Sequence, residues 1–333
     1  MASRFTILGL GVAGSTAAIL LARLGARVRG YDVMRRYWKP CGEVVPVGLL
    51  GLLRSKGLPM PAVVDEITVY KFYSVSEGLL RVYEAPRPLW ASIEKGAWVE
   101  RLRGEATARG AQLVYSRPPL AGRGVVVDAR GPFASRGSRV VVWRAYAENT
   151  LGSGYALMMI TQRPFGLAWA FSHGDELNIG GGFIGVGQPR GLVVKLLERM
   201  GNVEGVELTR GLRREAYSLV TLFPRVEPVA GDVLRIGEAA GLIQSLGGEG
   251  IRPAVASAIA LAEAVEEEDI ATAYLRRIEP LVLEARFSSL LLAAASILGP
   301  HALKRLSDSF MEAWLTGRLG DVRSAARRLL AGR

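Results

Sequence analysis

The order of hydrophobic and polar positions changes its period several times along the chain. An apolar run at Arg4–Leu8 is typical of a short buried strand. Small and apolar residues then recur with helical spacing over Ser15–Leu24, and a second strand-like run, Ala26–Tyr31, ends at Asp32. This order predicts a β-turn-α-β unit, whose small residues let the helix lie close to the sheet.

The middle of the chain is dominated by strand-like alternation. Val64–Tyr83 predicts a hairpin, and Arg139–Leu222 contains several strand-like runs that are interrupted by a predicted helix at Gly191–Met200. Runs of consecutive strands predict an antiparallel sheet that is separate from the N-terminal unit. The other elements predicted here are the helix Ala97–Ala108 and the strands Gln112–Tyr115 and Gly124–Asp128.

An alternating α/β pattern returns near residue 232. A strand at Asp232–Gly237 leads into a glycine-rich turn and the helix Ala254–Glu267, and the chain beyond Tyr274 is predicted to be helical with a basic end. The longest apolar stretch, around Leu290–Leu298, is shorter than the ~20 residues that cross a bilayer. No signal peptide is visible. We therefore expect a cytoplasmic protein that is either soluble or peripherally bound to a membrane.

Composition limits the class of protein. Half of the 333 residues are hydrophobic and 22% are charged, which is typical of a globular protein with a sizeable core. The single cysteine, Cys41, excludes an intramolecular disulfide and fits a reducing compartment. The net charge of +11 comes almost wholly from arginine. It fits either contact with anionic membrane lipids or the bias of heat-adapted proteins. No nucleic-acid-binding motif is present, so no nucleic-acid partner is expected.

The first turn carries the strongest motif, Gly9-Leu-Gly11-Val-Ala13-Gly14. Gly9 permits a tight turn, Gly11 lets the backbone approach a pyrophosphate, and Gly14 lets helix and strand pack closely. The helix N-terminus offers unpaired N–H groups to the phosphates. Asp32 is placed to accept hydrogen bonds from ribose hydroxyls. The unit predicts a dinucleotide site but does not separate NAD from FAD.

Two later segments favour FAD. Val125–Pro132 resembles the strand and turn that flavoproteins place under the FAD diphosphate, and Arg235–Gly241 with Gly247–Ile251 resembles their second flavin signature. A helix N-terminus beside the flavin would stabilise the anion that forms on reduction. The residues in these two segments predicted to bind the cofactor are Asp128, Gly131, Gly237, Glu238, Gly248, Glu249, Gly250 and Ile251.

With these segments in place, Phe5 to about Ala264 resembles the geranylgeranyl reductase family of flavoproteins, in the p-hydroxybenzoate-hydroxylase-like class. Lys39–Glu43 matches the family's cysteine-glycine-glutamate segment, Trp169–Phe171 resembles its aromatic strand, and Lys95 falls at its arginine-led helix start. The chain departs from the family pattern at Leu167, Ser172, Glu238 and Ser245, and it is short for the family.

The resemblance implies an α/β fold (α+β overall) with a Rossmann-type FAD-binding domain, an inserted antiparallel-sheet substrate domain and a C-terminal helical region. The predicted FAD-binding domain comprises residues 1–60, 86–138 and 228–272. The predicted substrate domain comprises residues 61–85 and 139–227, and the helical region comprises residues 273–333.

The resemblance also implies an activity and its site residues. The expected reaction is saturation of carbon–carbon double bonds of prenyl chains by hydride transfer from reduced FAD, with ferredoxin or NAD(P)H as electron donor. Cys41 is the predicted catalytic residue, Gly42, Glu43 and Lys95 are added to the cofactor site, and Trp169 and Phe171 are assigned to substrate binding. No metal site is expected, because the sequence contains no cluster of metal ligands.

Several alternatives remain open from the sequence. The nearest is a flavin monooxygenase acting on an apolar or aromatic substrate, followed by a non-catalytic flavin-binding protein associated with lipid and by an NAD-dependent dehydrogenase. Cys41 is either a proton donor or gate at the flavin or a small buried hydrophobe. Glu249 either joins a hydrogen-bond network at the flavin or caps the following helix. Trp169 and Phe171 are either cavity wall or ordinary core.

Overall fold

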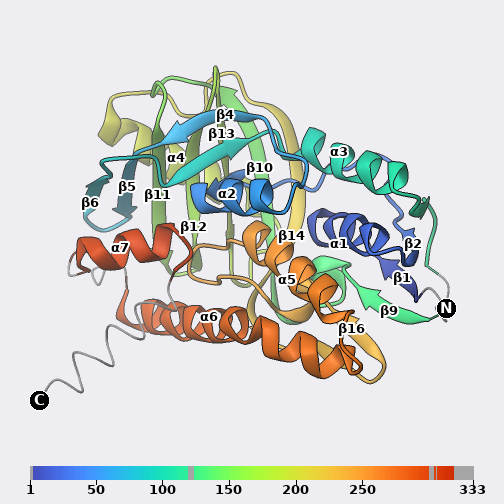
Figure 1. Ribbon diagram of the computed structural model, residues 1–333. Helices are drawn as coiled ribbons and strands as arrows, with labels where there is room; N and C mark the ends of the chain where they lie inside the picture. The colour runs from blue at the N-terminus through green and yellow to red at the C-terminus, as the bar shows by residue number, and fades with distance from the viewer. Residues whose placement is uncertain (1–2, 119–123, 300–303, 305, 319–333) are drawn as a thin grey trace, which may run out of the picture.

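The computed structural model describes residues 3–118, 124–299, 304 and 306–318 of the chain. The remaining residues, which include the C-terminal part 319–333 of the predicted helical region, lie outside that description. Figure 1 shows the N-terminal strands and helices on one side of the molecule, a broad sheet on the other, and a long helix along the lower edge.

The N-terminal unit is built on a six-stranded sheet with the order β15-β16-β9-β1-β2-β8. All its pairings are parallel except that of β15 with β16. Because β9 and β2 flank β1, the turns that follow β1 and β9 come together at one edge of the sheet. The strands are β1 (Arg4–Leu8), β2 (Arg27–Tyr31), β8 (Gln112–Val114), β9 (Val125–Asp128), β15 (Val229–Ala230) and β16 (Val233–Arg235).

Three helices pack together in this unit: α1 (Val12–Arg23), α3 (Lys95–Ala108) and α5 (Ile251–Ala264). Alanine, glycine and serine occupy more than half of the buried positions of α1 and α5, so the helix axes can approach closely. Sequence and structure agree here, because local glycine and alanine patterns specify this packing. The N-terminal β-turn-α-β unit is therefore as predicted.

A three-stranded antiparallel sheet, ordered β3-β7-β4, forms a separate small element. The prediction of one hairpin over Val64–Tyr83 was only partly right. Its first part belongs to this small sheet, and only β5 and β6 form a hairpin. The elements are β3 (Val44–Pro46), α2 (Val47–Ser55), β4 (Val63–Ile67) and β7 (Trp90–Ile93), followed in the next sheet by β5 (Val69–Ser74) and β6 (Gly78–Glu84).

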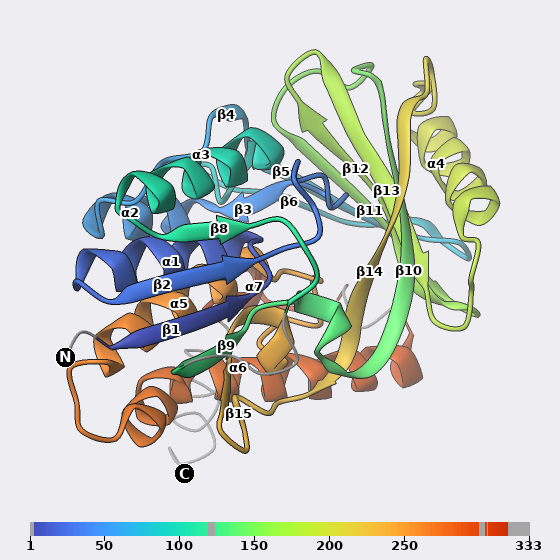
Figure 2. The ribbon, with the colours of Figure 1, turned by 90° about the vertical axis from the view of Figure 1, so that its right-hand side faces the viewer.

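The third sheet has seven strands in the order β14-β10-β13-β12-β11-β5-β6. It is antiparallel as predicted except between β11 and β5, which run parallel because the chain crosses between distant segments. Side chains alternate between its faces, so Val142 faces the centre of the molecule while Trp143 packs under α4 (Arg190–Glu204), as Figure 2 shows for the helix. The remaining strands are β10 (Arg136–Glu148), β11 (Tyr155–Gln162), β12 (Phe165–His173), β13 (Glu176–Phe183) and β14 (Arg213–Arg225).

Two further helices, α6 (Ile270–Leu298) and α7 (Asp308–Leu315), close the molecule on the side away from α4. The sequence-based expectation that no segment is long enough to cross a bilayer was wrong for α6. Its most apolar window has a mean hydropathy of 1.7, and by length and composition alone the helix could span a membrane. The apolar run was underestimated because it continues with helical spacing through the charged positions Glu284 and Arg286.

Candidate active site

A cavity of about 820 Å³ lies where the N-terminal unit, the seven-stranded sheet, α6 and α7 meet. This volume is in the upper part of the range found for ligand pockets. It brings together most of the residues that the sequence singled out, including Gly9, Gly11, Ala13, Asp32, Cys41, Gly42, Glu43, Lys95, Gly131, Glu238, Gly248, Glu249, Gly250, Ile251, Trp169 and Phe171. Gly14, Asp128 and Gly237 do not line the cavity and lie behind it.

The turn after β1 has the geometry of a phosphate cradle. Gly9 has a φ of 92°, and a Cβ there would lie 2.6 Å from the carbonyl oxygen of Ala129. A Cβ on Gly14 would lie 1.9 Å from the carbonyl oxygen of Gly9, so this glycine serves packing. No side chain caps the N-terminus of α1, and Gly11 borders the cavity. The first N–H groups of the helix are therefore available to an anion, which fits a nucleotide diphosphate.

Asp32 has more partners than the sequence indicated. One carboxylate oxygen accepts a hydrogen bond from the backbone N–H of Leu10 (2.7 Å), and the other accepts one from Met34 (2.8 Å). The guanidinium of Arg103 lies 3.3 Å from the first oxygen. The carboxylate of Asp32 thus organises the turn. Only its remaining lone pairs are left to accept the predicted hydrogen bonds from ribose hydroxyls.

Two acids of the flavin-like segments form ion pairs within the site. Asp128 is buried and binds the guanidinium of Arg130 at 2.6 Å. Glu238 accepts from the ammonium of Lys39 at 2.9 Å and from the backbone N–H of Thr221 at 2.8 Å. Sequence reasoning did not assign Lys39 and Arg130 to the site. Lys39 pairs with Glu238 from a distant segment, and Arg130 pairs with Asp128 of its own turn.

Cys41 contacts an ammonium group instead of an apolar core. The Nζ of Lys95 lies 2.7 Å from its sulfur and 2.6 Å from the carbonyl oxygen of Lys39. Burial alone would lower the pKa of Lys95, but the neighbouring Cys41, Tyr37 and Glu43 outweigh it and raise that pKa. Lys95 therefore stays charged in the interior, with its ammonium against the sulfur of Cys41. The interpretation of Cys41 as a plain buried hydrophobe does not fit this environment.

The Cys41 loop is held against the seven-stranded sheet. Asn178 donates to the carbonyl oxygen of Cys41 (3.0 Å), and Trp169 donates to the amide oxygen of Asn178 (3.1 Å). The rings of Trp169 and Phe171 stack with centroids 6.0 Å apart, and a Cβ on Gly42 would lie 2.8 Å from the Phe171 ring. The aromatic pair is therefore cavity wall, and it also fixes the position of the thiol.

Glu43 connects the same loop to strand β10. It adopts a φ of 55°, and its carboxylate accepts a hydrogen bond of 2.5 Å from the hydroxyl of Tyr146. Arg144 and Arg214 lie over the Tyr146 ring, at 4.3 Å and 4.0 Å from its centroid. This carboxylate thus anchors a tyrosine whose ring contacts two cations, a role that the sequence did not predict.

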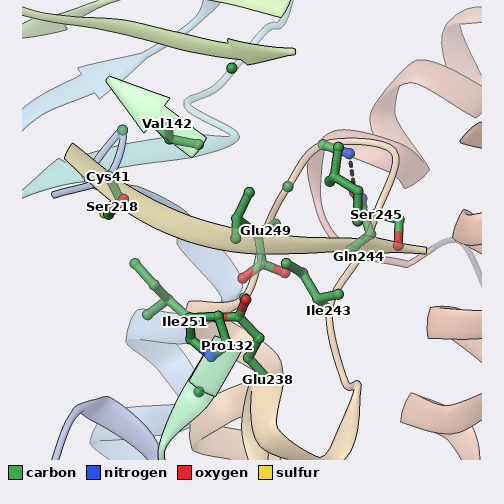
Figure 3. A pocket seen from close by; sticks show the side chains of 18 of the residues that line it. Cys41, Pro132, Val142, Ser218, Glu238, Ile243, Gln244, Ser245, Glu249 and Ile251 are labelled. Carbon is green, nitrogen blue, oxygen red and sulfur yellow. Dashed lines mark hydrogen bonds between the residues drawn. The ribbon is translucent and has the colours of Figure 1, made fainter. Parts of the chain in front are cut away.

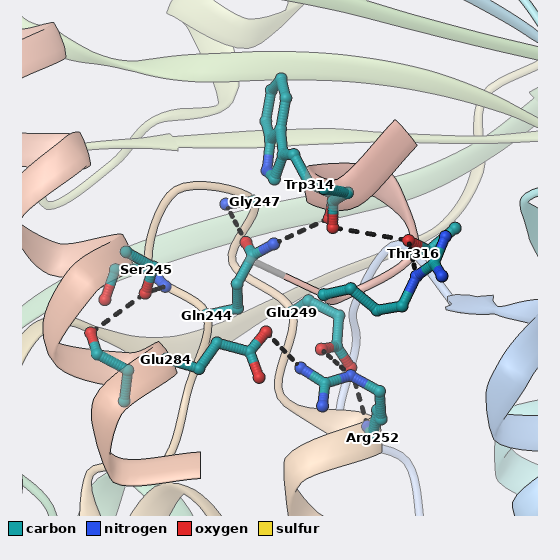
Figure 4. Close-up of polar contacts among 12 residues, drawn as sticks. Gln244, Ser245, Gly247, Glu249, Arg252, Glu284, Trp314 and Thr316 are labelled. Carbon is teal, nitrogen blue, oxygen red and sulfur yellow. Dashed lines mark hydrogen bonds and ion pairs between the residues drawn. The ribbon is translucent and has the colours of Figure 1, made fainter. Parts of the chain in front are cut away.

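The glycine-rich loop before α5 is fixed by the C-terminal helices (Figure 4). Gln244 donates to the carbonyl oxygen of Trp314 at 3.1 Å and accepts from the N–H of Gly247 at 2.7 Å. Ser245 donates its N–H to the hydroxyl of Ser288 at 3.0 Å. Because α6 and α7 supply these partners, the described C-terminal helices form part of the site.

Glu249 lies in this loop, and in the view of Figure 3 its carboxyl lies between Cys41 and Gln244. One oxygen accepts from the backbone N–H of Arg252 at 2.7 Å, which is the capping role considered from the sequence. Burial raises the pKa of Glu249 although Arg252 opposes the shift. Arg252 pairs more closely with Glu284, at 2.6 Å. Glu249 is therefore a buried acid that holds its proton at higher pH than an ordinary glutamate.

One part of the cavity wall was missed by the sequence. It is lined by Leu291, Leu292 and Ala295 of α6, with Trp314 and Leu315 of α7. The available signal was helical spacing of apolar residues around Leu290–Leu298, but periodicity alone does not tell which element an apolar face covers.

Comparison with known proteins identifies the fold. No family model matches the chain, and no curated protein sequence matches it. Among solved structures, a geranylgeranyl bacteriochlorophyll reductase-like protein from Thermoplasma acidophilum has a TM-score of 0.70 at 17% identity, with 93% of this chain and 90% of that chain covered. A flavin-dependent brominase has a TM-score of 0.72 at 15% identity, with 100% of both chains covered.

A 2-methyl-3-hydroxypyridine-5-carboxylic acid oxygenase has a TM-score of 0.67 at 16% identity, with 94% of this chain and 96% of that chain covered. These structures share one architecture. The chain therefore shares the α/β fold of these structures, among them a flavin-dependent brominase. The uncapped helix N-terminus and the glycine turn beside the cavity fit the diphosphate of FAD, which supports FAD as the cofactor.

Proposed function

We propose that this protein is an FAD-dependent oxidoreductase that saturates carbon–carbon double bonds in prenyl chains of the geranylgeranyl type. The observation that carries the proposal is the continuity of the cavity, which extends from the glycine turn past Cys41 to the apolar walls of β11, β12, α6 and α7. A prenyl chain is long and apolar, and this wall offers it a correspondingly long apolar surface.

The flavin, when bound, supplies the hydride. The residues of the chain then have two tasks. Met158, Trp169, Phe171 and Leu291 line the cavity with apolar surface, which excludes water from a carbon that acquires positive charge as a proton is added. A proton must be delivered to the other carbon of the double bond, and the candidate donors that face the cavity are the Cys41 thiol and the Glu249 carboxyl.

The proposed activity can be tested with the purified protein. We expect a bound yellow chromophore that mass spectrometry identifies as FAD. After anaerobic photoreduction, addition of a geranylgeranyl compound should reoxidise the flavin and give a product two hydrogens heavier per reduced bond. A protein that retains FAD but is never reoxidised by prenyl compounds would contradict the reductase and favour a non-catalytic flavin protein.

Cys41 and Glu249 are distinguished by paired variants. If Cys41 donates the proton, Cys41→Ala should keep FAD bound but slow anaerobic reoxidation by the alkene by about a hundredfold or more, on the order expected for general acid catalysis. Glu249→Gln should then change the rate little. The opposite result would assign the donor to Glu249, and the rate of the parent protein should then fall as pH rises through the raised pKa of that carboxyl. Unchanged rates in both variants would remove both groups from the mechanism.

Monooxygenation is the second candidate, because the solved structures with this fold include an oxygenase and a brominase. It predicts rapid NAD(P)H oxidation under air, dependent on an apolar or aromatic compound, and a hydroxylated product. The reductase predicts the saturated product without oxygen. The same anaerobic experiment, repeated with NAD(P)H and with reduced ferredoxin in place of light, would identify the electron donor.

A further inference from the structure

The outer side of α6 is an apolar surface that no described residue covers. Leu283, Leu290 and Ile297 are spaced seven residues apart and are 36%, 68% and 77% exposed. Ala294 and Leu298 are also exposed beside them. Residues at this spacing share one side of a helix. We call these five residues the outer face of α6. Figure 1 shows the helix along the lower edge of the molecule.

The opposite side of the same helix is fixed to the body of the protein. Glu284 pairs with Arg252 at 2.6 Å, and Ser288 accepts the backbone N–H of Ser245 at 3.0 Å. Leu292 is buried. Only 22% of the most apolar window of the helix is buried, so α6 is not an ordinary core helix. Its polar anchors hold it alongside the fold, which suits contact with a membrane surface and not passage through a bilayer.

The outer face is continuous with the cavity. Ala294 and Leu298 are exposed, and both also line the cavity, together with Leu291 and Ala295 on the next side of the helix. The cavity thus opens at the C-terminal half of α6, directly beside the uncovered apolar residues. An apolar molecule leaving a membrane at this point would pass from lipid to cavity wall without crossing water.

Two exposed arginines, one on α6 and one near its C-terminal end, fit the same partner. Arg286 is exposed on α6, and Arg163 is exposed in the turn between β11 and β12, next to Gln162, whose amide donates to the carbonyl oxygen of Ile297 at 3.3 Å. Among the ion pairs between residues that the structure describes, none involves Arg163 or Arg286. Cations beside an apolar helix face favour an anionic lipid surface, and the net charge of +11 acts in the same direction.

We infer that the outer face of α6 docks on an anionic lipid bilayer and places the opening of the cavity against the lipid. This inference goes beyond the proposed reaction and does not require it. Any apolar substrate drawn from a membrane would use the same opening. Docking is measured without turnover, so the docking inference can fail while the proposed activity stands. Equally, the proposed activity can fail while the docking inference stands.

The test is sedimentation of the full chain with vesicles of phosphatidylcholine alone or of phosphatidylcholine with phosphatidylglycerol. We expect binding to the anionic vesicles that weakens with salt. The double variant Leu290→Ser/Ile297→Ser should bind at least tenfold more weakly, because each side chain contributes apolar burial in the interface. Arg163→Gln/Arg286→Gln should lose mainly the preference for anionic vesicles.

Val203→Ser is the matched control, since Val203 is 48% exposed on α4, a helix on another side of the molecule, and it should bind like the parent. Thermal melting and FAD content confirm that each variant is folded. Equal binding by the Leu290/Ile297 variant would overturn the inference. So would a parent protein that binds neither vesicle, one that uses this face to form a dimer, or one that binds only after residues 319–333 are removed.

Discussion

Replacing Gly14 by alanine is expected to destabilise the N-terminal unit by about 3 kcal/mol and to weaken retention of FAD more than tenfold. The added Cβ would lie 1.9 Å from the carbonyl oxygen of Gly9 and 3.2 Å from the Ala129 side chain. Neither the carbonyl nor the strand behind it can move freely, because Gly9 donates to the carbonyl oxygen of Tyr31 at 2.7 Å. The cost is therefore at the upper end of the range for overpacking.

Gly51→Ala is the matched control for this prediction. Gly51 lies in α2, is exposed, and would place a new Cβ with no heavy atom within 4 Å. The same chemical change should stabilise the protein by about 0.5 to 1 kcal/mol, because alanine loses less backbone entropy in a helix. Urea unfolding and the ratio of flavin to protein absorbance after gel filtration report both quantities. A Gly14→Ala protein that matches the parent in both would contradict the packing role.

The contrast between these glycines shows what could be predicted from sequence. The turn at Gly9, Gly11 and Gly14 follows from a local pattern in which strand, glycines and helix lie within a few residues of each other. The contact of Cys41 with Lys95 joins residues that are 54 positions apart. The match of both segments to a known family brought these two residues into the same predicted site. The hydrogen bond between the two side chains had no signal in spacing or periodicity.

The features that sequence reasoning missed also depend on contacts between residues far apart in the chain. The parallel pairing of β5 with β11 joins segments with no shared local pattern, so alternation predicted two strands but not their relative direction. The closure of the cavity by α6 and α7 depends on which apolar helix face meets which sheet. Asp32 and Glu43, predicted to bind the cofactor, line the cavity, but their carboxylates are engaged by Leu10, Met34 and Tyr146. Side-chain partners of this kind are decided only by tertiary packing.

Arg252→Met is expected to lower the free energy of unfolding by about 3 to 5 kcal/mol. Arg252 lies between Glu249 and Glu284, and the exposed fractions of the three side chains are 15%, 15% and 8%. Removing the guanidinium takes away a cation that Glu249 and Glu284 share, which is costly because the largely buried carboxyl of Glu249 then loses its paired charge. Thermal melting should show a fall of roughly 10 °C for a protein of this size.

The loss of stability in Arg252→Met should grow as pH rises. Burial already raises the pKa of Glu249, and loss of Arg252 should raise the pKa of that carboxyl further. The folded variant then binds more protons than the unfolded chain above the ordinary glutamate pKa, so its stability falls as pH rises. The difference from the parent should be smaller at pH 5 than at pH 8. The triple variant Arg252→Met/Glu249→Gln/Glu284→Gln should recover part of the loss and most of the pH dependence.

Arg276→Met supplies the surface control, because Arg276 is on the same helix as Glu284 but pairs with Glu267 in solvent. Exposed pairs contribute little to stability, so this variant should melt like the parent at both pH values. If Arg252→Met melts like Arg276→Met, the buried cluster does not hold α5 to α6. The loop that carries Glu249 would then owe its position to Gln244 and Ser245 alone, which bind α7 and α6 directly.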